Sequence, residues 1–249
     1  MRHSYQLGFI SDDNIYEHVR NTVNTYRRSI NLEEFNSNII DPIKLTFDSK
    51  IYGKSFKEMI DSECIRQIDK TNSNNIGYFH QNLFKYVGHG WIVPPNGETG
   101  FDVENRSMHI YCEVKNKHNT MNAAASKATY IKMQNKLLED DNATCYLVQV
   151  ISKTSQDVNW VISLDGRRYS HNHIRKISID LFYNLVFHDP DAFMKLCKAL
   201  PIVLDDVLQD EPALQVQNTV FDELRVSSTD LYKSLFLLAF STYEGFDRF

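Results

Sequence analysis

Two acidic residues and a lysine, Asp102, Glu113 and Lys115, have the types and the spacing of a site that binds a metal ion and activates water. Two carboxylates held close together repel each other unless a cation lies between them. Oxygen ligands with open positions suit Mg²⁺, which lowers the pKa of bound water and stabilises charge on a phosphoryl oxygen. The lysine could orient the attacking water or help to deprotonate it. The chemistry predicted for this set is phosphodiester hydrolysis, with Asp102 and Glu113 as metal ligands.

A β-hairpin would bring these three residues together. In the segments FDVEN and MHIYCEVK, apolar residues alternate with polar ones. The period of two places Glu113 and Lys115 on one side of a strand and Val114 on the opposite side, toward the core. The intervening NRS is typical of a tight turn, so Asp102 is expected on the partner strand nearby. An exposed cross-strand ion pair is the alternative interpretation of the same residues.

The helix expected from about Ser55 to Lys70 carries a further candidate ligand. At 100° per residue, Glu63 falls near the centre of an apolar stripe that includes Met59 and Ile60. A charge that points inward is costly unless a lysine, an arginine or a metal ion pairs with it. Glu63 is therefore a candidate metal ligand, for the same ion as Asp102 and Glu113 or for a second one. An inward glutamate bonded to a core arginine is the alternative.

A second pattern of similar kind combines Asp41 with Asp48 and Lys50. Asp48 and Lys50 lie in the segment 43–53, IKLTFDSKIYG, whose alternation predicts a short strand before a glycine turn. We rank it below the first pattern because its two acids are closer in sequence and no basic, asparagine-rich segment follows it.

Basic and acidic residues are segregated along the chain. The run NKHNTMN directly follows Lys115, and GRRYSHNHIRK occupies 166–176, whereas 199–224 contains six acidic residues and no lysine or arginine. Such segregation predicts a positive face for a polyanion, although solvated surface charges are the alternative. Asparagine, lysine and arginine side chains bond phosphates and base edges. The candidate DNA-binding residues are Lys117, His118, Asn119, Asn122, Lys127, Arg167, Arg168 and His173.

Composition places the chain among ordinary globular proteins, with 42% hydrophobic and 24% charged residues in 249. Its apolar runs fall short of the roughly 20 residues of a membrane span, and its start shows no signal peptide. The four cysteines are spread singly, which predicts reduced core residues rather than disulfides or a zinc site. We expect a cytoplasmic protein without membrane attachment.

The elements expected along the chain describe an α/β protein with a mixed central β-sheet flanked by helices. Helices are expected at about 12–28 and 123–138, and strands at 144–151 and 158–164. One endonuclease-like domain is expected over residues 1–249, with its catalytic core at about 40–165 and a helical C-terminal region at about 174–249.

This order of elements resembles the PD-(D/E)xK nuclease core, with Phe101 where that pattern has proline. The segments DPIKLTFDSKIYG, SECIRQIDK, NIGYFHQN, GFDV, EVKNKHNTMN and DLFYNLVFHDPDAFMKLCKALP resemble the type II restriction endonucleases of the family that cuts GGNCC sites. The likeness covers roughly residues 5 to 210, and KNKHNTMN is its most specific part.

The resemblance implies Asp102 and Glu113 as metal ligands, Lys115 as the catalytic lysine and Glu63 as an upstream helper. It further implies a homodimer on palindromic double-stranded DNA, in-line attack by water with Mg²⁺, and products with a 5′-phosphate and a 3′-hydroxyl. A cognate DNA methyltransferase would be the functional partner. Two alternatives stay open: a structure-selective or repair nuclease of the same fold, and a catalytically silent DNA-binding module.

Overall fold

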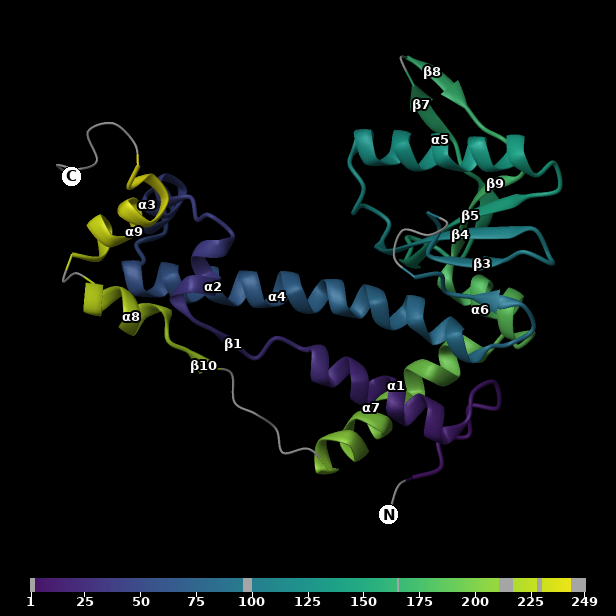
Figure 1. The fold of residues 1–249 in the computed structure, drawn as a ribbon, viewed down its shortest axis with the longest axis horizontal. Helices are drawn as coiled ribbons and strands as arrows, with labels where there is room; N and C mark the ends of the chain where they lie inside the picture. Colours follow the sequence, from purple (N-terminus) through teal and green to yellow (C-terminus); the bar gives the residue numbers. More distant parts are fainter. Residues whose placement is uncertain (1–2, 96–99, 165, 211–216, 228–229, 243–249) are drawn as a thin grey trace. The chain divides into compact units, whose positions relative to one another are not determined.

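The computed structural model describes residues 3–95, 100–164, 166–210, 217–227 and 230–242. The chain divides into two compact units, whose elements are drawn in Figure 1. Unit 1 comprises residues 1–24 and 75–212, and unit 2 comprises residues 25–74 and 213–249. The expectation of one endonuclease domain over the whole chain stays a prediction.

A mixed β-sheet forms the centre of unit 1, with the strand order β2-β3-β4-β5-β9-β6. Strands β4, β5 and β9 run parallel, whereas β2, β3 and β6 pair antiparallel with their neighbours. The bounds are β2 (Trp91–Ile92), β3 (Val103–Asn105), β4 (Ile110–Lys117), β5 (Thr144–Ile151), β6 (Asp157–Asn159) and β9 (Ile174–Ser178). The predicted fold class, a mixed sheet flanked by helices, is confirmed.

Helices cover both faces of this sheet, so its central strands are apolar on both sides. Cys112 and Val148 pack with α1 (Asp12–Thr25), α6 (Ile179–Phe187) and α7 (Ala192–Asp210) in one hydrophobic cluster. Tyr111 and Leu147 pack with α5 (Ala123–Glu139) in another. Because side chains alternate along a strand, successive residues of β4 and β5 enter opposite layers.

The strand expected at 158–164 is instead divided between two sheets. Its first residues belong to β6, and its last form β7 (Ile162–Leu164), which pairs with β8 (Arg167–Tyr169) in a separate hairpin. Trp160 between them is buried against Tyr130 of α5, with ring centroids 5.4 Å apart. The C-terminal region, expected to be helical from about 174, likewise opens with strand β9, which pairs with β5.

Unit 2 is built from helices and a short strand pair. Its elements are α2 (Leu32–Ser37), α3 (Pro42–Tyr52), the first part of α4 (Phe56–Leu83), α8 (Val220–Ser227) and α9 (Leu231–Phe240). Apolar side chains from all of these helices share one cluster, which includes Phe35, Leu45, Ile60, Leu224 and Leu235. Strand β1 (Ser29–Ile30) pairs in parallel with β10 (Gln217–Asn218), joining the two sequence segments of the unit.

The segment before Gly53 is helix α3, so the strand expected there is wrong. Asp41 caps the helix by accepting a hydrogen bond from the Lys44 amide, and Pro42 lies in its first turn. Gly53 ends the helix in the left-handed conformation, with φ at 63°. Proline at the start and glycine just past the end favour a helix more strongly than a short alternation favours a strand. On this helix Asp48 pairs with Lys44, so the second acidic pattern is not on a β-ribbon.

The other expected helices are confirmed with shifted bounds. Helix α1 begins after Ser11, whose Oγ accepts a hydrogen bond from the Asn14 amide. Helix α4 continues past Lys70, where the expected helix ends, to Leu83, and the 3₁₀ turn η1 (Phe84–Tyr86) follows it. Cys197 is exposed, contrary to the expectation of a core residue, whereas the other three cysteines are buried and all four are free. Among the described helices, none combines the length and apolar character that a membrane span needs.

Candidate active site

The β3–β4 hairpin brings Asp102 next to the strand that carries Glu113 and Lys115. The Asp102 amide donates to the Cys112 carbonyl at 2.9 Å, which extends the ladder of the hairpin by one residue. In return the Asp102 Oδ2 accepts from the Val114 amide at 2.8 Å. The Asp102 carboxylate is thereby fixed beside the peptide that follows Glu113, as the period of two and the tight turn predicted.

Glu113 and Lys115 lie on the same side of β4 and form an ion pair. Lys115 Nζ is 2.6 Å from Glu113 Oε1. The Glu113 side chain is 12% exposed, and a carboxylate this far from water is stabilised when cationic donors bond it. Because Glu113 and Lys115 are both on a strand, their backbone positions are more restricted than they would be on a loop.

Lys132 of α5 is a second cation at Glu113 that the sequence analysis did not assign to the site. Its ammonium pairs with Glu113 Oε2, donates to the Gly100 carbonyl and lies 4.6 Å from the Phe101 ring centroid. Lys132 was one of five lysines in the acid-free stretch after Glu113, and nothing in its spacing separated it from the others. The contact depends on how α5 packs against the hairpin.

Two further residues hold the backbone around Asp102. Gln81, at the end of α4, donates from Nε2 to the Asp102 carbonyl at 3.3 Å and is buried. Gly100 has φ at 77°, a conformation that residues with a side chain rarely adopt, and its carbonyl accepts from Lys132. The sequence analysis missed Gln81, although it lies in the segment NIGYFHQN that carried part of the family resemblance.

The pKa values of Asp102 and Glu113 are shifted in opposite directions. Burial raises the pKa of Asp102 above its usual value, and the negative charge of Glu113 raises it further. Burial also acts to raise the pKa of Glu113, but the charges and hydrogen bonds of Lys115 and Lys132 outweigh it, so this pKa is lowered. The charge of Asp102 is therefore disfavoured by its surroundings, whereas the charge of Glu113 is stabilised by the two lysines.

Asp102 and Glu113 fit a divalent ion of the Mg²⁺ type. This ion keeps several waters in proteins and is bound through one or two carboxylates. The charge of Glu113 is close enough to raise the Asp102 pKa, which is the repulsion that a cation between them relieves. In the part of the chain that the structure describes, no group of three or more His, Cys, Asp or Glu side chains is arranged to hold a metal.

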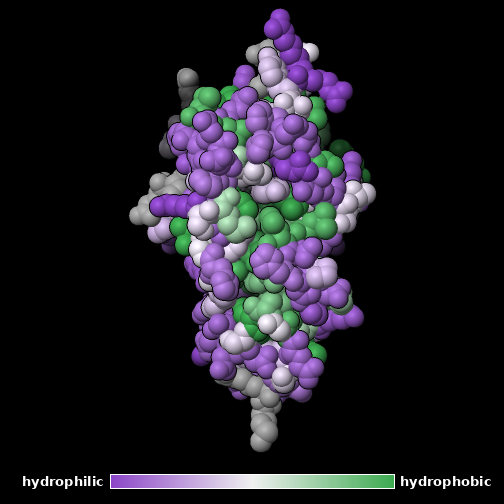
Figure 2. Space-filling model, turned by 90° about the vertical axis from the view of Figure 1, so that its right-hand side faces the viewer, coloured by the Kyte–Doolittle hydropathy of each residue, from purple (hydrophilic) through white to green (hydrophobic). Residues whose placement is uncertain are grey.

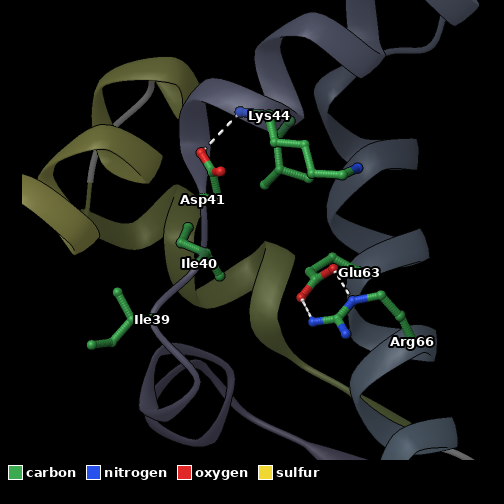
Figure 3. A pocket seen from close by; sticks show the side chains of 7 residues that line it. Ile39, Ile40, Asp41, Lys44, Glu63 and Arg66 are labelled. Atoms are coloured by element: carbon green, nitrogen blue, oxygen red, sulfur yellow. Dashed lines mark hydrogen bonds and ion pairs between the residues drawn. The ribbon is translucent and has the colours of Figure 1, made fainter. Parts of the chain in front are cut away.

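Glu63 belongs to unit 2, whereas the hairpin residues belong to unit 1. Its carboxylate bonds Arg66 through both oxygens and also accepts from Gln67 Nε2 at 3.1 Å. Figure 3 shows Glu63 and Arg66 paired beside Lys44 and Asp41, in a pocket of about 360 Å³ within unit 2. Arg66 therefore offsets the cost of the Glu63 charge, but its side chain is 59% exposed and lies on the same helix, so it is not the core arginine of the alternative interpretation. The role of Glu63 as a metal ligand stays a prediction.

Lys117, His118 and Asn119 follow the carboxylates directly at the carboxyl end of β4, and all three are exposed. The His118 amide donates to the Ile151 carbonyl at 3.0 Å, which fixes this turn against the end of β5. These side chains lie just beyond Lys115, at the end of β4 and in the turn that follows it.

Asn122 and Lys127 lie at the start of α5 and are exposed. Asn122 is the N-cap of the helix, and its Oδ1 accepts from the Ala125 amide at 2.8 Å. The side-chain oxygen of Asn122 therefore has a structural role, which leaves its NH₂ group as the donor toward DNA.

Arg167 and Arg168 extend from the β7–β8 hairpin and are exposed. Figure 2 shows strongly hydrophilic residues at the upper end of the molecule, where Figure 1 draws this hairpin beside α5. The hairpin is outside the main sheet, so its arginines reach a surface that is separate from β4.

His173 lies far from Lys117, the candidate DNA contact at the end of β4. Its Nδ1 is 3.1 Å from the Thr144 Oγ1 at the start of β5. Strands β4 and β5 run parallel, with Ile110 opposite Thr144 and Lys117 opposite Ile151. The two ends of β5 are about 23 Å apart at the rise of a β-strand, so His173 and Lys117 lie at opposite ends of the sheet.

Comparisons with known proteins find similarity to type II restriction enzymes. Residues 7–209 match the family model described as Eco47II restriction endonuclease. The chain is 32% identical over 218 residues to the type II restriction enzyme Sau96I of Staphylococcus aureus, covering 83% of each chain. It is 29% identical over 216 residues to the type II restriction enzyme Eco47II of Escherichia coli, covering 82% of this chain and 89% of that relative. The family match includes Asp102, Glu113 and Lys115 and ends before α8.

Proposed function

Because this chain belongs to the Eco47II restriction endonuclease family, we propose that it cleaves double-stranded DNA at a short palindromic GGNCC-like site in a reaction that depends on Mg²⁺. The observation that carries the proposal is the β3–β4 hairpin, which holds Asp102, Glu113 and Lys115 together. Hydrolysis by in-line attack of water would leave a 5′-phosphate and a 3′-hydroxyl.

Asp102 and Glu113 are the residues that would hold Mg²⁺. When bound, the ion supplies a Lewis acid that stabilises charge on the phosphoryl oxygen and makes water more acidic. Lys115 keeps its ammonium beside these carboxylates because Glu113 bonds it, so it can donate to the attacking water or to a phosphate oxygen. Asp102 keeps its orientation through the Val114 amide and through Gln81, which holds its carbonyl.

The exposed turn after β4 supports the proposed binding of DNA. Lys117, His118 and Asn119 lie within a few residues of Lys115 and offer donors to phosphates and base edges. Arg167 and Arg168 offer the side chain that most often reads guanine. His173 is less well supported as a contact near the scissile bond, because it lies at the opposite end of the sheet.

A palindromic site calls for two copies of the chain. A two-fold symmetric duplex is matched by a protein with the same symmetry, so a homodimer would present one Asp102–Glu113 pair to each strand. A cognate cytosine methyltransferase, encoded beside this chain, is the proposed functional partner because the host must protect its own sites.

Digestion of a plasmid of known sequence tests the proposal. With Mg²⁺ we expect discrete fragments whose ends map to GGNCC-like sites, and no cleavage in EDTA. Glu113→Ala should remove cleavage while retaining specific binding to the duplex in Ca²⁺. A smear would favour a structure-selective nuclease, and binding without nicking would favour a silent DNA-binding module. Full activity of Glu113→Ala would refute the site.

A further inference from the structure

The Glu113 carboxylate is bonded by two positively charged lysines, Lys115 and Lys132. Both of its oxygens are bonded, Oε1 by Lys115 and Oε2 by Lys132. The two lysines reach it from different elements, since Lys115 is on the same strand and Lys132 is on α5. An ion that binds Glu113, as the proposed function requires, would meet an oxygen that already bonds an ammonium group.

Lys132 differs from Lys115 in having other partners close by. Its ammonium also bonds the Gly100 carbonyl and lies over the face of Phe101. A backbone carbonyl and an aromatic face both stabilise a cation. Lys132 can therefore leave Glu113 Oε2 and retain two of its three contacts, so its departure costs less than that of a lysine held by the carboxylate alone.

We propose that Lys132 acts as a resident cation, which occupies Glu113 in the metal-free protein and is displaced from Oε2 when a divalent ion binds. This inference rests on the proposed function, in which Asp102 and Glu113 form the metal site. The lysine keeps Glu113 bonded and in place before the ion arrives, and it competes with the ion for the same oxygen. It sets the ion concentration at which the site fills.

The contrasting role for Lys132 is a permanent structural contact with Glu113. In that case the lysine would support the geometry of Glu113 at all times, and its removal would weaken the binding of an ion. Competition has the opposite sign, because removal of the competitor leaves an oxygen of Glu113 ready for the metal. The direction of the change in metal affinity separates the two roles.

Calorimetric titration of the full chain with MnCl₂, without DNA, tests the proposal. For Lys132→Met we expect the Kd for Mn²⁺ to fall by about tenfold, the scale of one charge-assisted contact. The melting temperature in EDTA should fall, because Glu113 loses a partner, and Mn²⁺ should restore it. Lys136→Met is the matched control, since Lys136 is one turn further along α5 and pairs with Glu139. Its Kd should equal that of the unchanged protein.

Equal or weaker Mn²⁺ binding by Lys132→Met would overturn the proposal and leave the proposed function intact. Lys132→Gln, which retains polarity without charge, serves in the same titration if the methionine variant does not fold. Glu113→Gln, combined with Lys132→Met, should abolish Mn²⁺ binding. If it does not, or if the unchanged protein binds no Mn²⁺, the metal site of the proposed function fails together with the inference.

Discussion

Lys115 and Glu113 form an ion pair along a single strand, with Nζ 2.6 Å from Oε1. Residues two apart on a strand share a face, so the pair needs no loop to bring it together. The same carboxylate is a candidate metal ligand, and it therefore couples the position of the lysine to the position of the ion. A rigid strand supports this coupling better than a loop could.

Replacement of Lys115 tests its part in the chemistry. We expect Lys115→Met to lower the single-turnover rate of cleavage by about a thousandfold, the usual scale for a positioned proton-transfer group. Folding should persist, because Glu113 keeps Lys132 as a partner. Specific binding to duplex DNA in Ca²⁺ should stay within a few-fold of the unchanged protein. A rate that changes less than tenfold would remove Lys115 from the mechanism.

Lys117, two residues further along β4, is expected to act on binding. Lys117→Met should weaken binding in Ca²⁺ to cognate and unrelated duplexes alike and reduce the slope of log K against log salt by about one, as loss of one phosphate contact does. Fluorescence anisotropy over a range of NaCl concentrations measures the slope. An unchanged slope would mean that the exposed Lys117 side chain does not meet the backbone.

The two carboxylates should differ in their effect on the stability of the metal-free protein. Glu113→Gln leaves Lys115 and Lys132 without their counter-charge, and we expect the free energy of unfolding to fall by about 2 kcal/mol, the scale of hydrogen bonds to charged groups. Asp102→Asn removes a buried charge that repels Glu113, so this variant should be as stable as the unchanged protein or more stable. The free energies of unfolding of the two variants are measured by urea unfolding in EDTA. Equal losses in both variants would contradict the opposite pKa shifts.

The pH dependence of these differences follows from the same shifts. The pKa of Glu113 is lowered in the folded protein, so its stabilising contribution is present above its usual value of 4.5 and is lost as the pH falls through the lowered pKa. The pKa of Asp102 is raised, so the cost of its charge is present at neutral pH and relieved as the pH falls from this raised pKa toward 3.8. Unfolding measured from pH 7 to pH 3 should show both the stability gain of Asp102→Asn and the stability loss of Glu113→Gln shrinking as the pH falls.

The β3–β4 hairpin could be predicted because the residues that form it lie close together in the sequence. The period of two set which side of β4 carries Glu113, and the short turn brought Asp102 to it. Lys132 and Gln81 could not be found in this way. Both reach the hairpin from helices distant in sequence, and their contacts are set by packing between layers. Likewise, the segment IRKIS has no period-two alternation of apolar and polar residues, and its strand is defined by the pairing with β5.

In unit 2 the strand prediction for residues 43–53 is wrong although the sequence contains the signals of a helix. Ile43, Leu45 and Phe47 alternate with polar residues, which predicted a strand. Only Leu45 of the three is buried, while Ile43 and Phe47 are exposed on α3. Asp41 and Gly53, one at each end of the segment, mark a capped helix. A cap at both ends is stronger evidence than three alternating residues.

The cap of α3 can be tested directly. Asp41→Ala removes the acceptor for the Lys44 amide, and we expect the free energy of unfolding to fall by about 1 kcal/mol, as for other helix caps. Asp48→Ala is the matched control on the same helix, because Asp48 takes part in an ion pair with the exposed Lys44, whose loss should change stability far less than loss of the cap. Urea unfolding followed by circular dichroism at 222 nm measures both. The capped helix is contradicted if Asp41→Ala costs no more than Asp48→Ala, because an extended segment would need no acceptor at that amide.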